Sequence, residues 1–317
     1  VMSCAALPPS PRQMCERIAV GPGPEDFALD LSVPGGRILV SSHERRKWER
    51  GEIYAVSPGG SAKILKRAGE PADLFFSPHG MDVRQIKGRT MVAVISHGAE
   101  AKTGKQQILF YEMRRDTLEF NRLVESPLFT SPNDLALDDD GGFYVSNDAH
   151  SRGSFLEMAL SLKRSTVVFC PPGEGECLVA ADGLAMANST AVQGNSVYVS
   201  TSRGNELFRY ERDASGRLTN RQLLFSGATL DNLFFHADNP EEILVASHPS
   251  GLAFLRHASD GSIPSPSVVY AIHTKSGASR VLYANDGTEI SAASGAFYWD
   301  RALFISQVFE PFLLRCQ

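Results

Sequence analysis

Oxygen-bearing side chains recur along the chain at intervals of roughly 50 residues. Each opens a short segment in which polar residues run into an apolar stretch. The six opening positions are Glu25, His79, Asn133, Asp182, Asp231 and Ser291, and Asn232 follows Asp231 directly. Carboxylate and amide oxygens are the ligands that calcium prefers in proteins. If the fold brings the six segments together, these residues predict a calcium site.

The alternative is that these residues only cap turns, because Asp and Asn side chains often bond to backbone groups before a strand. Several carboxylates at equivalent positions of a ring, however, would repel one another unless a cation lay between them. Zinc would require nitrogen or sulfur ligands. Neither His79 nor His97 has an obvious set of such partners in the sequence. Calcium is therefore the expected ion.

A second pattern identifies the elements that must position these residues. Six apolar runs, rich in β-branched and aromatic residues, end in serine or another small polar residue. They span residues 38–42, 92–97, 143–147, 197–201, 243–248 and 303–306. Their starts lie 54, 51, 54, 46 and 60 residues apart. This period is typical of a four-stranded propeller blade and too long for a leucine-rich or ankyrin repeat.

We therefore predict an all-β fold, a six-bladed β-propeller whose four-stranded blades surround a central calcium-containing channel. The apolar runs would be the second strand of each blade, buried on both faces. The segments with polar openings would be the innermost strands, so that their first residues meet at one end of the channel. Residues 1–14 are expected to form an N-terminal extension and residues 15–317 a single propeller. One helix is expected within residues 154–163, where apolar residues share one face.

The five cysteines indicate how the ring could be closed. Cys15 and Cys316 lie at opposite ends of the chain, and the two ends of a closed ring meet, so a disulfide between them could lock it. Cys170 and Cys177 flank a turn rich in proline and glycine and could form a second bridge. The alternative is that all five cysteines are free thiols.

Disulfides would imply an oxidising compartment. Residues 1–4 also resemble the end of a bacterial lipoprotein signal, with Cys4 as a possible site of a lipid anchor. The expected localisation is therefore secreted, periplasmic or membrane-anchored as a lipoprotein. The alternative for Cys4 is a trimmed or cloned N-terminus.

The composition argues against several classes of function. The chain carries 31 basic and 36 acidic residues, a net charge of −5, whereas a nucleic-acid binder normally has a basic excess on one face. No run of 18 or more apolar residues occurs, so no transmembrane segment is expected. The Gly-x-Ser-x-Gly motif of a nucleophile elbow is absent. The basic run at residues 45–47 is expected to be a solvated loop.

Five short motifs, in this order and spacing, resemble the paraoxonase family of calcium-dependent lactonases and arylesterases. They are residues 23–26 (Gly-Pro-Glu-Asp), 77–80 (Ser-Pro-His-Gly), 132–134 (Pro-Asn-Asp), 230–232 (Leu-Asp-Asn) and 247–249 (Ser-His-Pro). The resemblance extends over nearly the whole chain. It also puts Cys15 and Cys316 at the positions of the family's ring-closing disulfide.

The resemblance implies two calcium ions and a histidine pair. The ligands that it implies for a catalytic calcium are Glu25, Asn133, Asp182, Asp231 and Asn232. A second, structural calcium would take Asp26, Asp134 and the backbone carbonyl of Met81. His79 matches the position proposed as general base, His97 its partner in a dyad, and His248 a histidine of the active-site wall. The family usually has Asn where this chain is expected to place Asp182.

The activity implied is hydrolysis of a small-molecule lactone or aryl ester, by water attack on a carbonyl that calcium polarises. Two alternatives remain open. One is a sugar-lactone hydrolase of the gluconolactonase type, which has the same fold and a metal in its channel. The other is a non-catalytic propeller in which calcium is structural and an outer face binds a partner.

Overall fold

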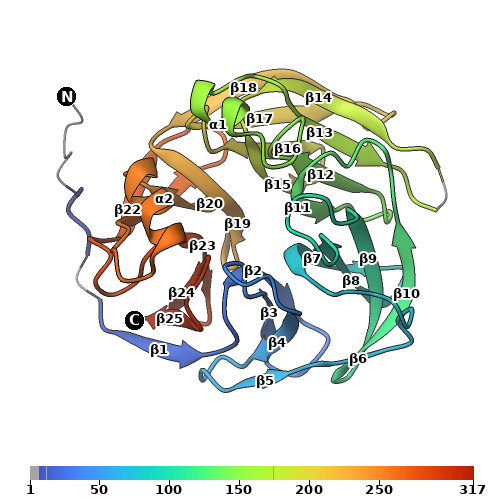
Figure 1. The fold of residues 1–317 in the computed structure, drawn as a ribbon, viewed down its shortest axis with the longest axis horizontal. Coiled ribbons are helices and arrows are strands. Elements are labelled where there is room, and N and C mark those ends of the chain that lie inside the picture. The colour runs from blue at the N-terminus through green and yellow to red at the C-terminus, as the bar shows by residue number, and fades with distance from the viewer. Residues whose placement is uncertain (1–6, 12, 174) are drawn as a thin grey trace.

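The structure is a computed structural model that describes residues 7–11, 13–173 and 175–317. Six sheets are arranged around a central axis, each with its innermost strand toward the channel (Figure 1). The predicted six-bladed propeller is therefore confirmed. Cys4 and its expected lipid anchor lie outside the described residues.

The first three blades take up the N-terminal half of the chain. Blade 1 contains β2 (Pro24–Asp30), β3 (Arg37–Ser42), β4 (Glu52–Val56) and β5 (Ala62–Ile64). Blade 2 contains β7 (Pro78–Ile86), β8 (Arg89–Ser96), β9 (Gln107–Arg114) and β10 (Thr117–Val124), with the short β6 (Lys66–Ala68) parallel to β10 at its outer edge. Blade 3 contains β11 (Pro132–Leu137), β12 (Phe143–Asn147), β13 (Ser165–Cys170) and β14 (Leu178–Leu184).

The remaining blades complete the ring. Blade 4 contains β15 (Ala187–Gln193), β16 (Ser196–Thr201), β17 (Glu206–Arg212) and β18 (Leu218–Ser226). Blade 5 contains β19 (Thr229–His236), β20 (Asn239–His248), β21 (Ser267–His273) and β22 (Ser279–Asn285). Blade 6 contains β23 (Ala293–Trp299), β24 (Ala302–Gln307), β25 (Phe312–Cys316) and, from the other end of the chain, β1 (Cys15–Ala19).

Blade 6 closes the ring because it combines both ends of the chain. β1 pairs antiparallel with β25, and Cys15 lies directly opposite Cys316 in that pairing. The two cysteines form a disulfide across 301 residues of sequence. A second disulfide joins Cys170 to Cys177. Both predicted bridges are confirmed.

The core consists of six apolar clusters, one between each pair of neighbouring blades. This arrangement explains why the second strands are apolar at nearly every position. Every residue of β3 is buried, for example, because its two faces pack against blades 2 and 6. The six apolar runs of the sequence correspond to β3, β8, β12, β16, β20 and β24.

Two of the predicted inner strands are wrong. The segment 181–186 was expected to open blade 4, but β14, the outermost strand of blade 3, extends to Leu184 and β15 begins only at Ala187. Gly183 and Met186 adopt positive φ angles of 68° and 57°, which turn the chain between these strands. The last inner strand, β23, likewise begins two residues after Ser291.

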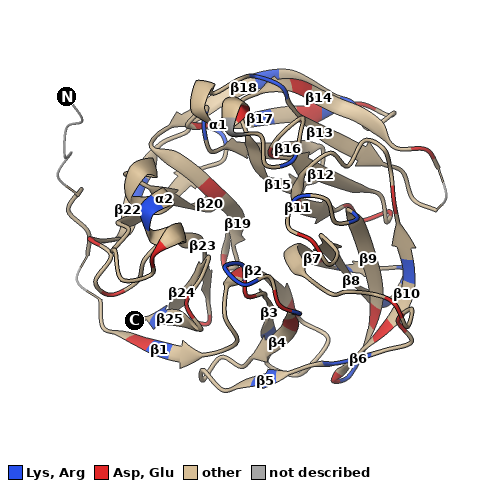
Figure 2. Ribbon diagram, viewed as in Figure 1, with Lys and Arg blue, Asp and Glu red and all other residues tan. Residues whose placement is uncertain are grey.

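Among the described residues, two helices lie over the blades (Figure 1). The expected one is α1 (Phe155–Leu160), whose N-cap Ser154 accepts a hydrogen bond from the Glu157 amide. The sequence did not predict α2 (Gly251–Ser259), which follows β20 and is capped by Ser250. Basic and acidic residues are scattered over the whole ring (Figure 2). Within the described ranges, neither helix is long and apolar enough to cross a membrane.

Candidate active site

Every inner strand carries an irregularity in its pairing at the same point, next to its opening residues. The register shifts after Pro24 in β2, Pro78 in β7, Pro132 in β11, Ala187 in β15, Leu230 in β19 and Ala293 in β23. Residues skipped by such a bulge have no partner opposite them, and the local bend redirects their side chains. The repeat therefore turns one or two polar side chains per blade into the same end of the channel.

Four of these side chains come together with oxygens that lack hydrogen-bond partners. They are Glu25 Oε2, Asn133 Oδ1, Asn188 Oδ1 and Asn232 Oδ1. The amide of Asn232 donates to Glu25 Oε1 over 3.0 Å, which leaves its own oxygen free. Buried polar atoms are normally paired, so a cluster of unpaired acceptors indicates a missing positive partner.

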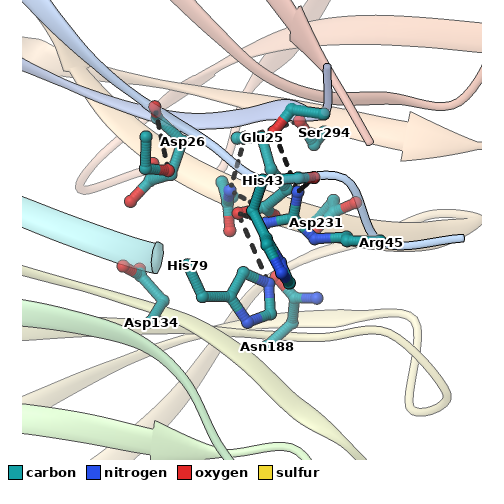
Figure 3. Close-up of polar contacts among 12 residues, drawn as sticks. Glu25, Asp26, His43, Arg45, His79, Asp134, Asn188, Asp231 and Ser294 are labelled. Atoms are coloured by element: carbon teal, nitrogen blue, oxygen red, sulfur yellow. Dashed lines mark hydrogen bonds and ion pairs between the residues drawn. The ribbon is translucent and has the colours of Figure 1, made fainter. Parts of the chain in front are cut away.

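The oxygen set fits a hard cation. Asp231 adds a carboxylate to the same end of the channel, where Figure 3 shows it close to Glu25 and Asn188. No group of three or more His, Cys, Asp or Glu side chains with metal-binding geometry occurs in the part of the chain that the structure describes. The converging oxygens are instead largely those of amides, which calcium binds alongside carboxylates.

A second pair of carboxylates, Asp26 and Asp134, lies beside the first group (Figure 3). Asp26 accepts hydrogen bonds from the backbone amides of Met81 (2.6 Å) and Phe27 (2.8 Å). Burial and the charge of Asp134 raise the pKa of Asp26 well above its usual value. Burial also raises the pKa of Asp134 to about 8. Two such groups side by side need either a proton or a cation between them.

The two predicted histidines are in direct contact. His79 Nδ1 lies 2.8 Å from His97 Nε2, and His79 Nε2 lies 3.4 Å from Glu25 Oε2. His97 is fully buried, and its Nδ1 lies 2.6 Å from Gln106 Oε1. Burial, and then the charge of Arg152, lowers the pKa of His97 well below its usual value. His97 is therefore neutral, and it can only orient His79 and share a hydrogen bond with it.

The floor of a cavity of about 250 Å³ is formed by Glu25, His79, Asn133, Asn188 and Asp231. His248 follows from the end of β20, and its Nε2 lies 2.9 Å from Asp231 Oδ2. The opposite part of the wall is apolar and comes from both helices and neighbouring loops; it consists of Met158, Met186, Phe254, Leu255 and Val308. The cavity thus places a cation-binding set and a histidine pair below a surface that suits an aliphatic or aromatic molecule.

The arylesterase family model matches residues 23–317, nearly the whole propeller. The chain belongs to the arylesterase family. It is 27% identical to human serum paraoxonase/lactonase 3, over 92% of this chain and 79% of the relative. It is 25% identical to serum paraoxonase/arylesterase 2 of Bos taurus, over 91% and 78%.

Among solved structures, a gluconolactonase from Xanthomonas campestris resembles this arylesterase-family chain with a TM-score of 0.61 at 17% identity. The match covers 96% of this chain and 89% of that structure. At this identity, the similarity shows the common propeller fold alone.

The placement of Asp182 in the channel is wrong. Asp182 is exposed on β14, the outermost strand of blade 3, whereas Asn188 on β15 points into the cavity. The pattern of polar residues followed by apolar ones occurs twice within a few residues, and only the second copy opens an inner strand. A strict period would have found the second, because the steps from 25 to 79, 79 to 133 and 133 to 188 are 54, 54 and 55 residues.

The basic run after β3 is not a solvated loop throughout. Arg45 lines the cavity, where its Nη2 lies 3.7 Å from Glu25 Oε2. Arg46 turns the other way and pairs with Glu310 over 3.2 Å. Arg46 and Lys47 are exposed, as expected. The run resembled an ordinary charged turn because nothing in its composition shows which side chain enters the channel.

Proposed function

We propose that the protein hydrolyses lactones or aryl esters with calcium bound in its channel. Its family makes it a lactonase- or esterase-type hydrolase. The observation that carries the calcium proposal is the set of buried oxygens without partners. The residues proposed to hold a catalytic ion are Glu25, Asn133, Asn188, Asp231 and Asn232. Asp26, Asp134 and the Met81 carbonyl are proposed for a second ion.

The bound calcium would act as a Lewis acid that polarises the scissile carbonyl. The chain's own residues fix where that carbonyl can lie. The Asn232 amide and the His79 ring both contact the Glu25 carboxylate, which holds it at the floor of the cavity. Burial alone would raise the pKa of Glu25, but His79 and Arg45 together lower it below its usual value. Glu25 therefore remains ionised, as a cation ligand must.

His79 is the proposed general base for the attacking water. This role requires the tautomer in which His79 donates from Nδ1 to His97 Nε2, so that its Nε2 is free to take a proton. His97 then donates from its own Nδ1 to Gln106 Oε1 over 2.6 Å. This tautomer also requires that Arg152 Nη1, which lies 2.8 Å from His97 Nδ1, donates to Gln106 Oε1 instead. The neutral His97 ring accepts this hydrogen bond both before and after His79 becomes positive. Such a chain stabilises the protonated form of His79 without moving a second proton.

His248 is proposed to line the substrate cavity and to orient Asp231. Its Nε2 contacts Asp231 Oδ2, and its ring packs against Phe254 with 4.5 Å between ring centroids. Its Nδ1 is buried without a partner, so a polar group of the substrate could bind there.

The experiment that tests the proposal measures turnover of three substrates: an aliphatic lactone, a sugar lactone and an aryl ester. Each is assayed with calcium and after its removal by a chelator. We expect turnover of the aliphatic lactone or the aryl ester, lost with the chelator and restored by calcium. Turnover of the sugar lactone alone would favour the gluconolactonase type. No turnover of any substrate, with unchanged stability in the chelator, would favour a binding module.

The base is tested with His79→Gln. We expect turnover to fall by a factor of about 10² to 10⁴ while bound calcium is unchanged. Full activity in this variant would remove His79 from the mechanism.

We also propose that the protein works in an oxidising compartment. The support is its two disulfides, one of which joins the ends of the ring.

A further inference from the structure

Two arginines reach the cavity from opposite blades. Arg45 follows β3 of blade 1, and Arg203 follows β16 of blade 4. Arg203 is held beside α1, because its Nε donates to the Met158 carbonyl over 2.8 Å. No described carboxylate lies within 4.0 Å of Arg203. The cavity therefore has a positive group on each of two facing walls.

The orientation of Arg45 is fixed by its own surroundings. Its Nη1 donates to the carbonyls of Gly23 (2.8 Å) and His43 (3.2 Å). Only 13% of the side chain is exposed. Its Nη2 is buried and makes no hydrogen bond. A buried N–H group without an acceptor is costly, so this nitrogen is available for an acceptor that enters the cavity.

The acidic residues of the cavity do not balance the positive charge of Arg45 once calcium is bound. The acidic residues of its lining are Glu25, Asp148 and Asp231. Glu25 and Asp231 are assigned to calcium in the proposed function, and His248 also contacts Asp231. Asp148 faces the charge of Arg152 outside the lining. With a divalent ion on Glu25 and Asp231, the positive charges of Arg45 and Arg203 are uncompensated.

We propose that Arg45 binds an acidic substituent of the substrate, so that the cavity prefers lactones or esters that carry a carboxylate besides the scissile bond. This inference rests on the proposed function. A guanidinium group matches a carboxylate in both charge and geometry. The apolar side chains of the helices would contact the carbon chain between the two groups. Arg45 is then the residue that determines specificity.

The test compares two esters with the same leaving group and the same acyl length, 4-nitrophenyl pentanoate and mono-4-nitrophenyl glutarate. The calcium-loaded protein is compared with Arg45→Gln and with Lys47→Gln, a control that removes an exposed charge from the same loop. We expect kcat/KM of the native protein to be higher for the glutarate ester. Arg45→Gln should lower that value about tenfold or more beyond any loss on the pentanoate ester, which reports the contribution of Arg45 to Glu25. Lys47→Gln should change neither.

Three outcomes would overturn the inference. One is a native protein that does not prefer the glutarate ester. Another is an Arg45→Gln variant in which kcat/KM falls equally for both esters, which would indicate a structural role. The third is an Arg45→Gln variant whose kcat/KM for the glutarate ester is unchanged while inhibition by free pentanoate is weaker. Arg45 would then bind the carboxylate of the product rather than that of the substrate.

Two further measurements keep the inference testable in other cases. If Arg45→Gln does not fold, Arg45→Lys keeps the charge and should keep part of the preference. If neither ester is turned over, calorimetric titration with glutarate tests Arg45 alone, and the proposed function fails only if the aliphatic lactone is not turned over either. Binding to the native protein and none to Arg45→Gln would support the inference, and equal binding would overturn it.

Discussion

At the scale of single residues, the site depends on where the bulge of each inner strand falls. Glu25 and Asn133 lie directly after a proline that opens its strand. Proline has no N–H to donate, so it suits the first position of a strand. The following residue is left out of the ladder and points into the channel. The chemistry of the site thus follows from a local backbone feature that the chain repeats in every blade.

The assignment of Asn188 rather than Asp182 as a calcium ligand can be tested directly. Asn188→Ala removes one of the buried oxygens and should weaken calcium binding by about tenfold or more, because the remaining ligands cannot complete the shell. Asp182→Asn is the matched control, since it changes an exposed residue on β14. Calcium titration of both variants checks this. Tight binding in Asn188→Ala and weak binding in Asp182→Asn would reverse the assignment.

The pair Asp26 and Asp134 predicts how stability depends on pH. In the calcium-free protein the pKa of Asp134 is raised from 3.8 to about 8, so between these values the folded state holds a proton that the unfolded state has lost. Stability must therefore fall as pH rises through this window. Asp134→Asn cannot ionise at this position and should lack this part of the decline, which amounts to about 1 kcal/mol or more.

The measurement is the free energy of unfolding from pH 4 to pH 8 for both proteins, in calcium-free buffer and with calcium. Calcium should flatten the decline of the native protein. Parallel curves for the two proteins without calcium would show that Asp134 does not carry the effect.

Much of the site could be predicted at this scale, but not all of it. The polar residues at the start of β2, β7, β11 and β19 stand out because each is followed by an apolar stretch. Asn188 was missed because a similar pattern lies a few residues earlier. Arg45 could not be predicted, since its role depends on the direction of its loop, which sequence spacing does not record.

At the scale of elements, the second strands were the easiest to predict. Each is buried on both faces between two blades, and it must therefore be apolar at successive positions. The outer strands have a weaker apolar pattern because one edge faces solvent. The end of β14 therefore resembles the start of an inner strand. Helix α2 is not predicted because its nine residues are fewer than the roughly 11 to 18 over which a helical period can be recognised.

Helix α2 supplies Phe254 and Leu255 to the cavity wall, and its N-cap is a point where it can be weakened. The Ser250 hydroxyl accepts a hydrogen bond from the Ala253 amide over 3.2 Å. Ser250→Ala should destabilise the protein by about 1 kcal/mol and raise KM more than it lowers kcat. Ser259→Ala, at the other end of the helix, is the control. Identical unfolding curves for all three proteins would show that the cap does not stabilise α2.

At the scale of the whole molecule, the ring is held by contacts between neighbouring blades and closed by one disulfide. The two disulfides enclose loops of very different length, 301 and 7 residues of separation. In the chain-entropy description the longer loop stabilises the folded state by about 6 kcal/mol and the shorter by about 2 kcal/mol. Replacing Cys15 and Cys316 by serine should therefore lower Tm considerably more than replacing Cys170 and Cys177. Equal losses would mean that strand pairing between β1 and β25 alone closes the ring.

The central claim is that calcium held by the ring of channel oxygens is required for hydrolysis. It is tested most directly by adding calcium back to the chelated protein while bound calcium and lactone turnover are measured in the same samples. We predict that turnover returns in proportion to occupancy of the site formed by Glu25, Asn133 and Asn188. Full turnover of the lactone by protein that retains no calcium would contradict the claim.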